Sequence, residues 1–432
     1  MPCKSLVHEL QIGTYDDSLA RLYASNGTSA SLDSACERAC QAVRMFMDTF
    51  TLDGSVPAAL FSGPGRTEIG GNHTDHQHGH ALCGSVDLDM LGCAAPSGRN
   101  VIRIQSEGYP LLEVNLDSLL PREEEKNTTT ALIRGMAAKV QELGYPLAGF
   151  DAYVTSNVLS GSGLSSSAAY ETLLGNILNY FCCGGALDAV EIAKIGQYAE
   201  NIYFGKPCGL LDQMGSSVGG AVAIDFADPA NPVVEQVDYD FACSGHTLCI
   251  VDTGSNHGDL TDDYADITRE MGAVAAYFQK KVLREVPEGE IYKNFLALRK
   301  ECGDRAVLRA MHFYEDDRRA VLETQALKVG DFDRFLFLVN QSGLSSELLL
   351  QNVWSPSAPQ AQAVSVALNL GRQLLGGAGA IRVHGGGFGG TIQAFVPNDM
   401  LDGFKAGMER AVGEGKCHTL RVRPQGGCVV AG

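Results

Sequence analysis

Residues 149–171 read GFDAYVTSNVLSGSGLSSSAAYE and pass from an alternating run into a glycine- and serine-rich loop, followed by an apolar segment of helical length. The alternation over residues 149–158 predicts a strand, and residues 168–182 predict a helix. Glycine lets a backbone approach a ligand without a Cβ clash, and the free N–H groups at a helix start attract anions. This order is typical of a phosphate-binding loop, although it lacks the lysine of a Walker A motif, and a serine-capped helix after a loop explains it equally well.

A second glycine-rich segment, VHGGGFGG at residues 383–390, has the pattern G-x-G-x-x-G at Gly385, Gly387 and Gly390. A dinucleotide-binding fingerprint requires this pattern to open a helix. The following residues, TIQAFV, predict a strand instead, so we reject that interpretation. What remains is a glycine turn between two strands, which either has a structural role or is approached closely by a ligand.

Residues 62–80, SGPGRTEIGGNHTDHQHGH, concentrate charged and polar side chains, among them Arg66, Glu68, Asn72, Asp75 and four histidines. Asparagine, histidine and aspartate suit sugar recognition. Four histidines in eight residues also suggest a metal site, but the spacing of zinc motifs is absent and no cysteine pair follows. A polar surface loop is the simplest alternative, whereas the flanking glycines favour a loop of defined shape.

Residues 205–220, GKPCGLLDQMGSSVGG, place Asp212 among apolar neighbours and between glycines. An acidic residue in this setting is either the cap of a helix or turn, or a catalytic carboxylate. Composition alone favours the cap.

The composition of the chain is that of an ordinary globular protein. It has 432 residues, a formal charge of −18, 45% hydrophobic and 19% charged residues, and at roughly 150 residues a domain this length predicts two to three domains. The acidity argues against nucleic-acid binding and against attraction to anionic membranes, but not against an anionic ligand held by local donors. Glycine is in excess: it makes up 50 of the 432 residues, or about 12%, whereas its usual share is about 7%.

Other features bear on the compartment. No apolar run approaches the ~18 residues of a membrane span, and the first residues, MPCKSLVHELQIGTYDD, lack the apolar region of a secretory signal. The thirteen cysteines are scattered and form no C-x-x-C pair. We therefore expect reduced thiols, many of them buried, in a cytoplasmic protein.

The predicted elements mix helices and strands without a regular βαβ alternation, which favours an α+β fold. Besides the strand and helix above, helices are expected at residues 32–50, 128–143, 186–204, 264–283 and 322–329, and strands within residues 100–116, 219–226, 248–251, 380–384 and 391–396. The Pro/Asn-rich turn at residues 229–232 is the best candidate for a boundary, which divides the chain into domains 1–228 and 229–432.

Taken together, these segments resemble the galactokinase branch of the GHMP small-molecule kinases. GRTEIGGNHTDHQHG is similar to the family's sugar signature GRVNLIGEHTDYNGG, and GSGLSSSAA resembles its phosphate loop. CGLLDQMGS resembles the segment that holds the catalytic aspartate, and IRVHGGGFGG resembles the third motif, usually RMTGGGFGG. The similarity runs across nearly the whole chain and implies an α+β, two-domain GHMP kinase fold with the active site in the cleft between the domains.

The resemblance implies a role for each matching residue. Asp212 would face the anomeric hydroxyl of a sugar, and Arg66 would stabilise the anionic oxygen and keep Asp212 ionised. The sugar contacts would be Asn72, His73, Asp75, Gly209 and Tyr264. The triphosphate of ATP would be wrapped by Gly161, Ser162, Gly163, Leu164, Ser165, Ser166 and Ser167, and Mg²⁺ would be held by Ser167 and Glu200.

Three departures from the family's sugar signature bear on the substrate. The family has Asn, Glu and Tyr where this chain has Glu68, Asn72 and His76. The family Glu reaches toward the sugar's 6-hydroxyl, and its replacement by the amide of Asn72 keeps hydrogen bonding but removes a negative charge. Galactose is the first expected substrate, and a related sugar such as galacturonate or N-acetylgalactosamine stays open.

The activity that the resemblance implies is ATP-dependent phosphorylation of galactose at its anomeric hydroxyl, giving galactose 1-phosphate. Some galactokinase-like proteins are instead sugar sensors that regulate transcription through a partner, and loss of a Ser-Ala pair in the phosphate loop accompanies their lost activity. Ser167 and Ala168 are present here, which favours an enzyme. The expected partners are the sugar and ATP, not nucleic acid or membrane, for a monomer or weak homo-oligomer.

Overall fold

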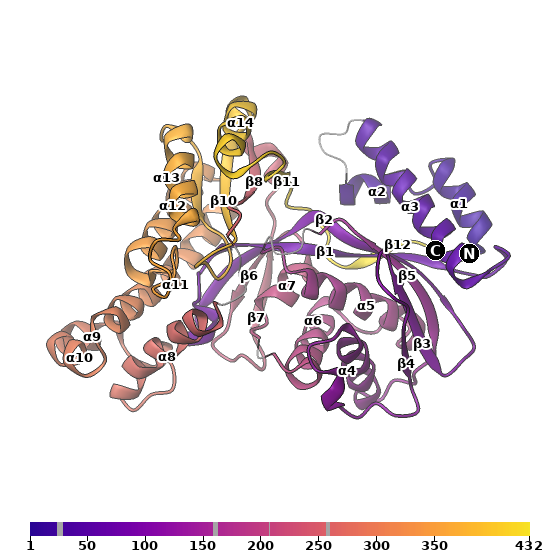
Figure 1. Cartoon of the computed structure of the whole chain (residues 1–432), viewed down its shortest axis with the longest axis horizontal. Helices are drawn as coiled ribbons and strands as arrows, with labels where there is room; N and C mark the ends of the chain where they lie inside the picture. Colours follow the sequence, from indigo (N-terminus) through magenta and orange to yellow (C-terminus); the bar gives the residue numbers. More distant parts are fainter. Residues whose placement is uncertain (24–28, 159–162, 207, 256–259) are drawn as a thin grey trace.

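The structure is a computed structural model that describes residues 1–23, 29–158, 163–206, 208–255 and 260–432. Its strands form two β-sheets, each covered by helices (Figure 1). The strands are β1 (Ala59–Gly70), β2 (His80–Pro96), β3 (Val101–Ser106), β4 (Leu112–Asn115), β5 (Phe150–Ser156), β6 (Ala221–Asp225), β7 (Val233–Val237), β8 (His246–Asp252), β9 (Ala380–Val383), β10 (Thr391–Pro397), β11 (Cys417–Leu420) and β12 (Cys428–Ala431).

The α-helices are α1 (Cys3–Gln11), α2 (Asp16–Tyr23), α3 (Ser29–Phe50), α4 (Thr129–Glu142), α5 (Ser166–Cys182), α6 (Ala189–Tyr198), α7 (Leu211–Val218), α8 (Thr261–Tyr277), α9 (Glu288–Lys293), α10 (Phe295–Glu301), α11 (Asp304–Lys328), α12 (Phe332–Ser345), α13 (Ala363–Leu375) and α14 (Leu401–Val412). Shorter 3-10 or π-helical segments include η1 (Asp75–Gln77), η3 (Ala199–Phe204) and η6 (Ser346–Leu350). Side-chain caps fix several helix starts, as at α6, where Asp188 and Glu191 form a capping box.

The first sheet has eight strands. They follow the order β12-β1-β2-β5-β3-β4, with β6 paired to β2 and β7 paired to β6. Strands β3 and β5 run parallel, and the other paired neighbours run antiparallel. Strand β12 comes from the end of the chain and pairs with β1, so the two chain ends lie close together (Figure 1).

Helices cover both faces of the first sheet, with α4 to α7 on one face and α1 to α3 on the other (Figure 1). Successive side chains of a strand point to opposite faces, and β1 serves two apolar cores in this way. Phe61 is fully buried in the core that α4 to α6 complete, while Leu60 is fully buried in the core with α1 to α3. All of β1 is buried, and this rigid strand carries part of the site described below.

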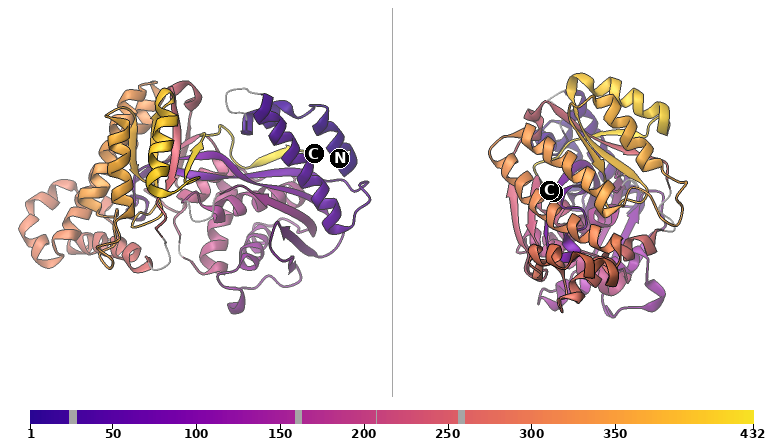
Figure 2. Two further views of the ribbon diagram at one scale, coloured as in Figure 1. Left: turned by 45° about the horizontal axis from the view of Figure 1, so that its top comes forward. Right: turned by 90° about the vertical axis from the view of Figure 1, so that its left-hand side faces the viewer.

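The second sheet has four antiparallel strands in the order β11-β8-β10-β9. Helices α13 and α14 pack on one face, with core residues such as Val251, Ile381 and Ala394. A core that contains α12 residues on the other face also takes in Ile69 and Leu82 of the first sheet, so it joins the two sheets. Helices α8 to α10 extend outward at the same end of the molecule (Figure 2).

Residues from both sides of the predicted boundary at residue 229 contribute to the first sheet. Strand β7 extends the sheet just after the boundary, and β12 returns to it from the end of the chain. The strands of the second sheet come from residues 246–420. The division into domains 1–228 and 229–432 stays a prediction.

Most predicted elements are confirmed, including the strand and the helix expected within residues 149–182, which are β5 and α5. Residues 159–162 of the loop between them lie outside the described residues. The structure differs at three places. The helix expected at residues 264–283 is α8, which already ends at Tyr277. Residues 62–70, expected in a shaped loop, lie within β1, and the helix expected at residues 322–329 is the end of α11, which begins at Asp304. The strand at residues 62–70 was not predicted because this segment is rich in polar residues and glycines, whereas β-branched and aromatic residues are the ones that favour strands. None of the helices in the described ranges is long and apolar enough to cross a membrane.

Candidate active site

Arg66 and Asp212 form an ion pair between the first sheet and helix α7. Arg66 lies in β1, and Asp212 lies in the first turn of α7. The Nε and Nη2 atoms of Arg66 lie 2.7 and 2.6 Å from Oδ1 of Asp212. The arginine side chain is 8% exposed and the aspartate side chain 38% exposed, so the pair is open to a ligand on its carboxylate side.

The ion pair sets the charge of Asp212. Burial raises the pKa of Asp212, but the attraction of Arg66 and its hydrogen bond outweigh burial and hold the pKa below its usual value. Asp212 is therefore ionised at neutral pH. A carboxylate of low pKa is a weak base, so it suits a role in orienting a hydroxyl and accepting its proton late in a reaction.

Close backbone packing fixes α7 against β1. A Cβ on Gly215 would lie 3.0 Å from Cβ of Arg66, so a larger residue would push the helix away from the strand. The Ser216 hydroxyl donates a hydrogen bond to the carbonyl of Pro64 at 2.6 Å. Together these contacts hold Asp212 beside Arg66.

The predicted phosphate loop ends next to Arg66. Gly161 and Ser162 lie outside the described residues. The backbone N–H of Arg66 donates to the carbonyl of Leu164 at 2.9 Å, and its Nη1 donates to the carbonyl of Gly163. The arginine of the ion pair therefore also holds the described end of the loop.

Helix α5 starts directly after this loop. Ser165 is the N-cap residue, with a positive φ of 54°, and its side chain makes no capping hydrogen bond. Ser166 and Ser167 open the helix and are partly exposed. The serine-capped helix considered as an alternative is thus not what the structure has, and the N-terminal end of α5 can serve an anion near Asp212.

The residues predicted to hold Mg²⁺ come from two helical segments that meet beside α7. Glu200 lies in η3 and accepts a hydrogen bond from Nε2 of Gln213 at 2.9 Å. The same nitrogen donates at 3.0 Å to Glu171, which lies one helical turn after Ser167 in α5. Glu200 is thereby tied to the helix that carries Ser167.

Glu171 is a buried carboxyl that the sequence analysis missed. Within the described ranges, its Oε1 and the Oε1 of Gln213 have no hydrogen-bond partner. Burial and the nearby charge of Glu200 raise the pKa of Glu171 well above its usual value. These oxygens, with Glu200 and the Ser167 hydroxyl, are hard donors of the kind that Mg²⁺ prefers. The described part of the chain holds no cluster of three or more His, Cys, Asp or Glu residues arranged for a metal.

The residues predicted to contact a sugar come from several segments of the chain. Asp75 lies in η1, and a Cβ on Gly209 would lie 2.5 Å from its Oδ2. Both residues border a cavity of about 260 Å³. Nε2 of His73 lies 2.9 Å from the carbonyl oxygen of Gly386, and burial together with the charge of His76 lowers the pKa of His73 to about 4. His73 is therefore neutral at pH 7, donating from Nε2 and keeping Nδ1 as an acceptor.

Tyr264, in α8, packs on the glycine loop between β9 and β10. Its hydroxyl donates to the carbonyl of Gly387 at 3.0 Å, and a Cβ on Gly386 would lie 2.4 Å from its Cε1. The rings of Tyr264 and His73 lie 6.5 Å apart. The glycine loop of residues 383–390 thus joins Tyr264 to the segment of residues 62–80.

Asn72 differs from its predicted role as a sugar contact. It is fully buried, and its amide Nδ2 donates to Glu68 and to the carbonyl of Gly385, while its Oδ1 accepts from Ser346 and Asn352. An amide side chain offers two donors and two acceptor lone pairs, so all four are used inside the protein. Asn72 ties the first sheet to the other half of the molecule instead of facing a sugar.

Glu68 and Arg382 are charged residues at this site to which the sequence analysis gave no role. Arg382, in β9, is fully buried. Its Nη2 donates to Oε1 of Glu68 at 3.1 Å, and its Nη1 donates to the carbonyl of Ile69. If residues 62–70 had been predicted as a strand, Glu68 would have been placed on the same face as Arg66. The pairing of Glu68 with Arg382 could not have been predicted, because the two residues are 314 positions apart and no local signal connects them.

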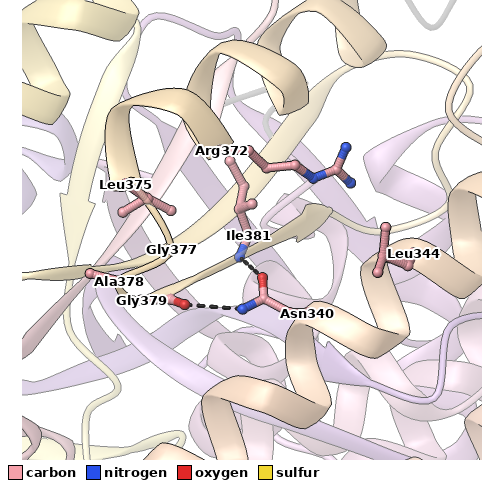
Figure 3. Close-up of a pocket in the computed structure, with 8 residues that line it drawn as sticks. All are labelled: Asn340, Leu344, Arg372, Leu375, Gly377, Ala378, Gly379 and Ile381. Carbon is pink, nitrogen blue, oxygen red and sulfur yellow. Dashed lines mark hydrogen bonds between the residues drawn. The ribbon is translucent and has the colours of Figure 1, made fainter.

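A second cavity, of about 320 Å³, lies on the other half of the molecule (Figure 3). Asn340 of α12 lines it, accepting a hydrogen bond from the backbone N–H of Ile381 and donating one to the carbonyl of Gly379, each at 3.0 Å. None of the predicted site residues lines this cavity.

Comparisons with known proteins agree with this geometry. The family model for the GHMP kinases N terminal domain matches residues 131–220, which include the phosphate loop and Asp212. The galactokinase galactose-binding signature matches residues 45–96, which include Arg66, His73 and Asp75. The chain belongs to the GHMP kinases.

Individual relatives narrow the assignment. A galactokinase from Streptomyces coelicolor is 29% identical over 364 residues, which are 83% of this chain and 90% of the relative. The structure of Lactococcus lactis galactokinase complexed with galactose has a TM-score of 0.74 at 22% identity, over 89% of this chain and 98% of that one. Methanococcus jannaschii mevalonate kinase has a TM-score of 0.61 at 16% identity, over 86% and 99%. Within the family, the chain falls in the galactokinase branch.

Proposed function

We propose that the chain is an ATP-dependent kinase that phosphorylates the anomeric hydroxyl of galactose and releases galactose 1-phosphate and ADP. The observation that carries this proposal is the ion pair of Arg66 and Asp212 beside the start of α5. It puts a carboxylate that can orient a hydroxyl next to an anion-binding helix end. The galactose-binding signature and the galactokinase relatives support galactose as the sugar.

In the proposed reaction, Asp212 accepts a hydrogen bond from the anomeric hydroxyl and holds its oxygen in line with the γ-phosphorus of ATP. A P–O bond forms to that oxygen while the bond between the γ-phosphorus and the β–γ bridging oxygen breaks, and ADP leaves. The hydroxyl proton passes late to Asp212 and from there to solvent. Arg66 stabilises the negative charge that develops on the sugar oxygen.

The phosphates of ATP are proposed to lie at the start of α5, against the segment from Gly163 to Ser167, with Gly161 and Ser162 completing the loop. The hard oxygen donors near Ser167 and Glu200 support Mg²⁺ as the accompanying ion, held by these two residues. When bound, Mg²⁺ supplies neutralisation of the phosphate charges.

The proposed sugar contacts are His73, Asp75, Gly209 and Tyr264. Asp75 lies in η1, His73 just before it, Gly209 just before α7, and Tyr264 in α8. The cavity that Asp75 and Gly209 border supports the binding of a ligand there. We also propose that the protein works in the cytoplasm as a monomer or weak homo-oligomer. Its thirteen free cysteines, all within the described ranges, suit a reducing compartment.

A coupled assay of ADP release tests the proposal. The purified protein is given Mg·ATP with galactose, galacturonate, N-acetylgalactosamine, glucose or arabinose, and we expect the highest kcat/KM with galactose. A higher value with another sugar would reassign the substrate. Tight binding of galactose and ATP without ADP release from any sugar would support a sugar sensor instead.

A further inference from the structure

Glu68 occupies a position from which it can reach the proposed sugar. It lies two residues after Arg66 in β1, and the register with β2 is regular there, with Arg66 opposite Ser85 and Glu68 opposite Cys83. Alternate residues of a strand share a face, and two residues span about 7 Å. Glu68 therefore points to the same side as Arg66, at a distance on the scale of a sugar ring.

Of the two carboxylate oxygens of Glu68, Oε1 is held by hydrogen bonds within the protein, whereas Oε2 is available to a ligand. Oε1 accepts hydrogen bonds from Nδ2 of Asn72 at 2.8 Å and from Nη2 of Arg382 at 3.1 Å. Oε2 accepts none from any residue in the described ranges, and the side chain keeps 11% of its surface exposed. The two anchors fix the direction of the carboxylate, so the second oxygen is presented in a defined position.

The charges around Glu68 are those of the proposed site. Both Arg66 and Asp75 act on its carboxyl group, and Asp75 borders Gly209 and the cavity beside it. Asn72, the neighbour expected to contact the sugar, has no hydrogen-bonding capacity left. The carboxylate that the family signature has at position 72 is therefore not lost from this chain, because an exchange of Asn and Glu moves it to position 68.

We propose that Glu68 is a specificity-determining residue whose Oε2 accepts a hydrogen bond from a sugar hydroxyl remote from the anomeric carbon. The inference rests on the proposed sugar kinase activity. A carboxylate at this place favours a neutral hydroxyl and repels a second carboxylate, so galacturonate should be a poorer substrate than galactose. Arg382 and Asn72 are positioning residues that aim Glu68.

Monodeoxy analogues of galactose, lacking the 2-, 3-, 4- or 6-hydroxyl, test the proposal with wild type and Glu68→Gln. In the wild type we expect the loss of one particular hydroxyl to lower kcat/KM by roughly 10- to 100-fold, the value of a hydrogen bond to a charged group. In Glu68→Gln that single penalty should shrink to a few-fold, while the penalties for the other hydroxyls stay unchanged. If Glu68→Gln does not fold, Glu68→Asp keeps the charge, withdraws the oxygen by one methylene and should shrink the same penalty.

Glu113→Gln is the matched control, because Glu113 is an exposed carboxylate on β4, at the other end of the strand order of the first sheet. This variant should keep every wild-type penalty. If Glu68→Gln slows all the analogues in parallel and leaves each penalty intact, Glu68 has only a structural role and the inference is overturned. If the wild type releases no ADP with galactose or any analogue, it is the proposed function that fails.

Discussion

Asp212 is the residue on which the proposed turnover depends most directly. Asp212→Asn keeps the shape of the side chain but removes the charge that orients the hydroxyl and accepts its proton. We expect kcat to fall by about 10²- to 10⁴-fold, with ATP affinity unchanged because the loop at α5 stays in place. Coupled ADP release measures the first quantity, and calorimetric titration with a non-hydrolysable ATP analogue measures the second.

The control for this variant is Asp228→Asn, which neutralises an exposed carboxylate on the turn after β6 and should leave kcat at the wild-type value. Substantial turnover by purified, folded Asp212→Asn would remove Asp212 from the reaction.

Glu68 should make sugar binding depend on pH. Burial raises the pKa of Glu68 to about 7, against the attraction of Arg382 and Arg66, while Asp75 and Glu323 also act on it. Above this pKa Glu68 is a carboxylate, and charge strengthens its hydrogen bond with a hydroxyl. We therefore expect KM for galactose to fall as the pH rises through neutrality. Initial rates of wild type and Glu68→Gln across this range test the assignment, since an inflection that persists in the variant belongs to another group.

At the scale of residues, roles that depend on a contiguous motif could be predicted from the sequence, whereas contacts between distant segments could not. The motifs around Arg66 and Asp212 are contiguous, so both residues could be singled out before the structure, and the structure places them in contact. The burial of Asn72 could not be predicted, because its partners Ser346 and Asn352 lie 274 and 280 residues away.

At the scale of elements, the glycine loop between β9 and β10 should tolerate no side chain at Gly387. Its φ is +83°, and a Cβ there would lie 2.2 Å from the carbonyl oxygen of Asn352. Gly387→Ala combines left-handed backbone strain with a clash against backbone, and we expect it to lower the free energy of unfolding by about 2–5 kcal/mol. Urea denaturation measures the change, and the loss of the loop's contact with Tyr264 should lower kcat/KM for the sugar.

Gly330→Ala separates the two causes. Gly330, between α11 and α12, also has a positive φ, of +72°, but a Cβ there meets open space. We expect this control to cost only about 1–2 kcal/mol from strain. Equal losses in the two variants would contradict the close contact at Gly387.

Element prediction succeeded where one physical signal dominated a segment. The periodic helices and the strand–loop–helix order of residues 149–182 belong to this group. Strand β1 could not be predicted over residues 62–70, because its polar side chains and glycines serve the site and close packing against α5 and α7 instead of a simple apolar alternation. Gly63 is an example of this close packing, since a Cβ there would lie 2.3 Å from the carbonyl oxygen of Ala169 in α5.

At the scale of the whole molecule, Asp89 of β2 ties the N-terminal helices to the first sheet. Its fully buried carboxylate accepts hydrogen bonds from Tyr23, Arg38 and Ser62 and lies 3.4 Å from Arg423. Asp89→Asn leaves two buried or partly buried guanidinium groups without their counter-charge. We expect it to lower the free energy of unfolding by about 3–5 kcal/mol, measured by urea denaturation at neutral pH.

The same carboxylate predicts an acid sensitivity. Burial raises the pKa of Asp89, but the attraction of Arg38 and Arg423 outweighs burial and the pKa lies below its usual value. Stability from a lowered pKa is present above the unfolded pKa and is lost as the pH falls through the folded one. The destabilisation by Asp89→Asn should therefore shrink in acid. Glu235→Gln, which breaks the exposed pair with Lys328, is the control and should cost about 1 kcal/mol or less at any pH.

The fold class could be predicted from the sequence, but the order of the strands in the first sheet could not. Mixed elements and the family resemblance led to an α+β, two-domain fold, and the structure has the GHMP kinase fold. The participation of β7 and β12 in the first sheet carries no sequence signal, because a four- or five-residue strand is placed by its neighbours more than by its own pattern.

The pairing of β12 with β1 has a consequence for biosynthesis. The edge of β1 that β12 covers is made well before residues 428–431, and synthesis at ~5–20 residues per second leaves that edge open for roughly 20 to 70 seconds. An uncovered strand edge is a template for pairing with another chain. The nascent polypeptide is therefore exposed to aggregation on crowded polysomes, and ribosome-associated chaperones should raise its soluble yield more than they raise its rate of refolding once the full-length chain is free.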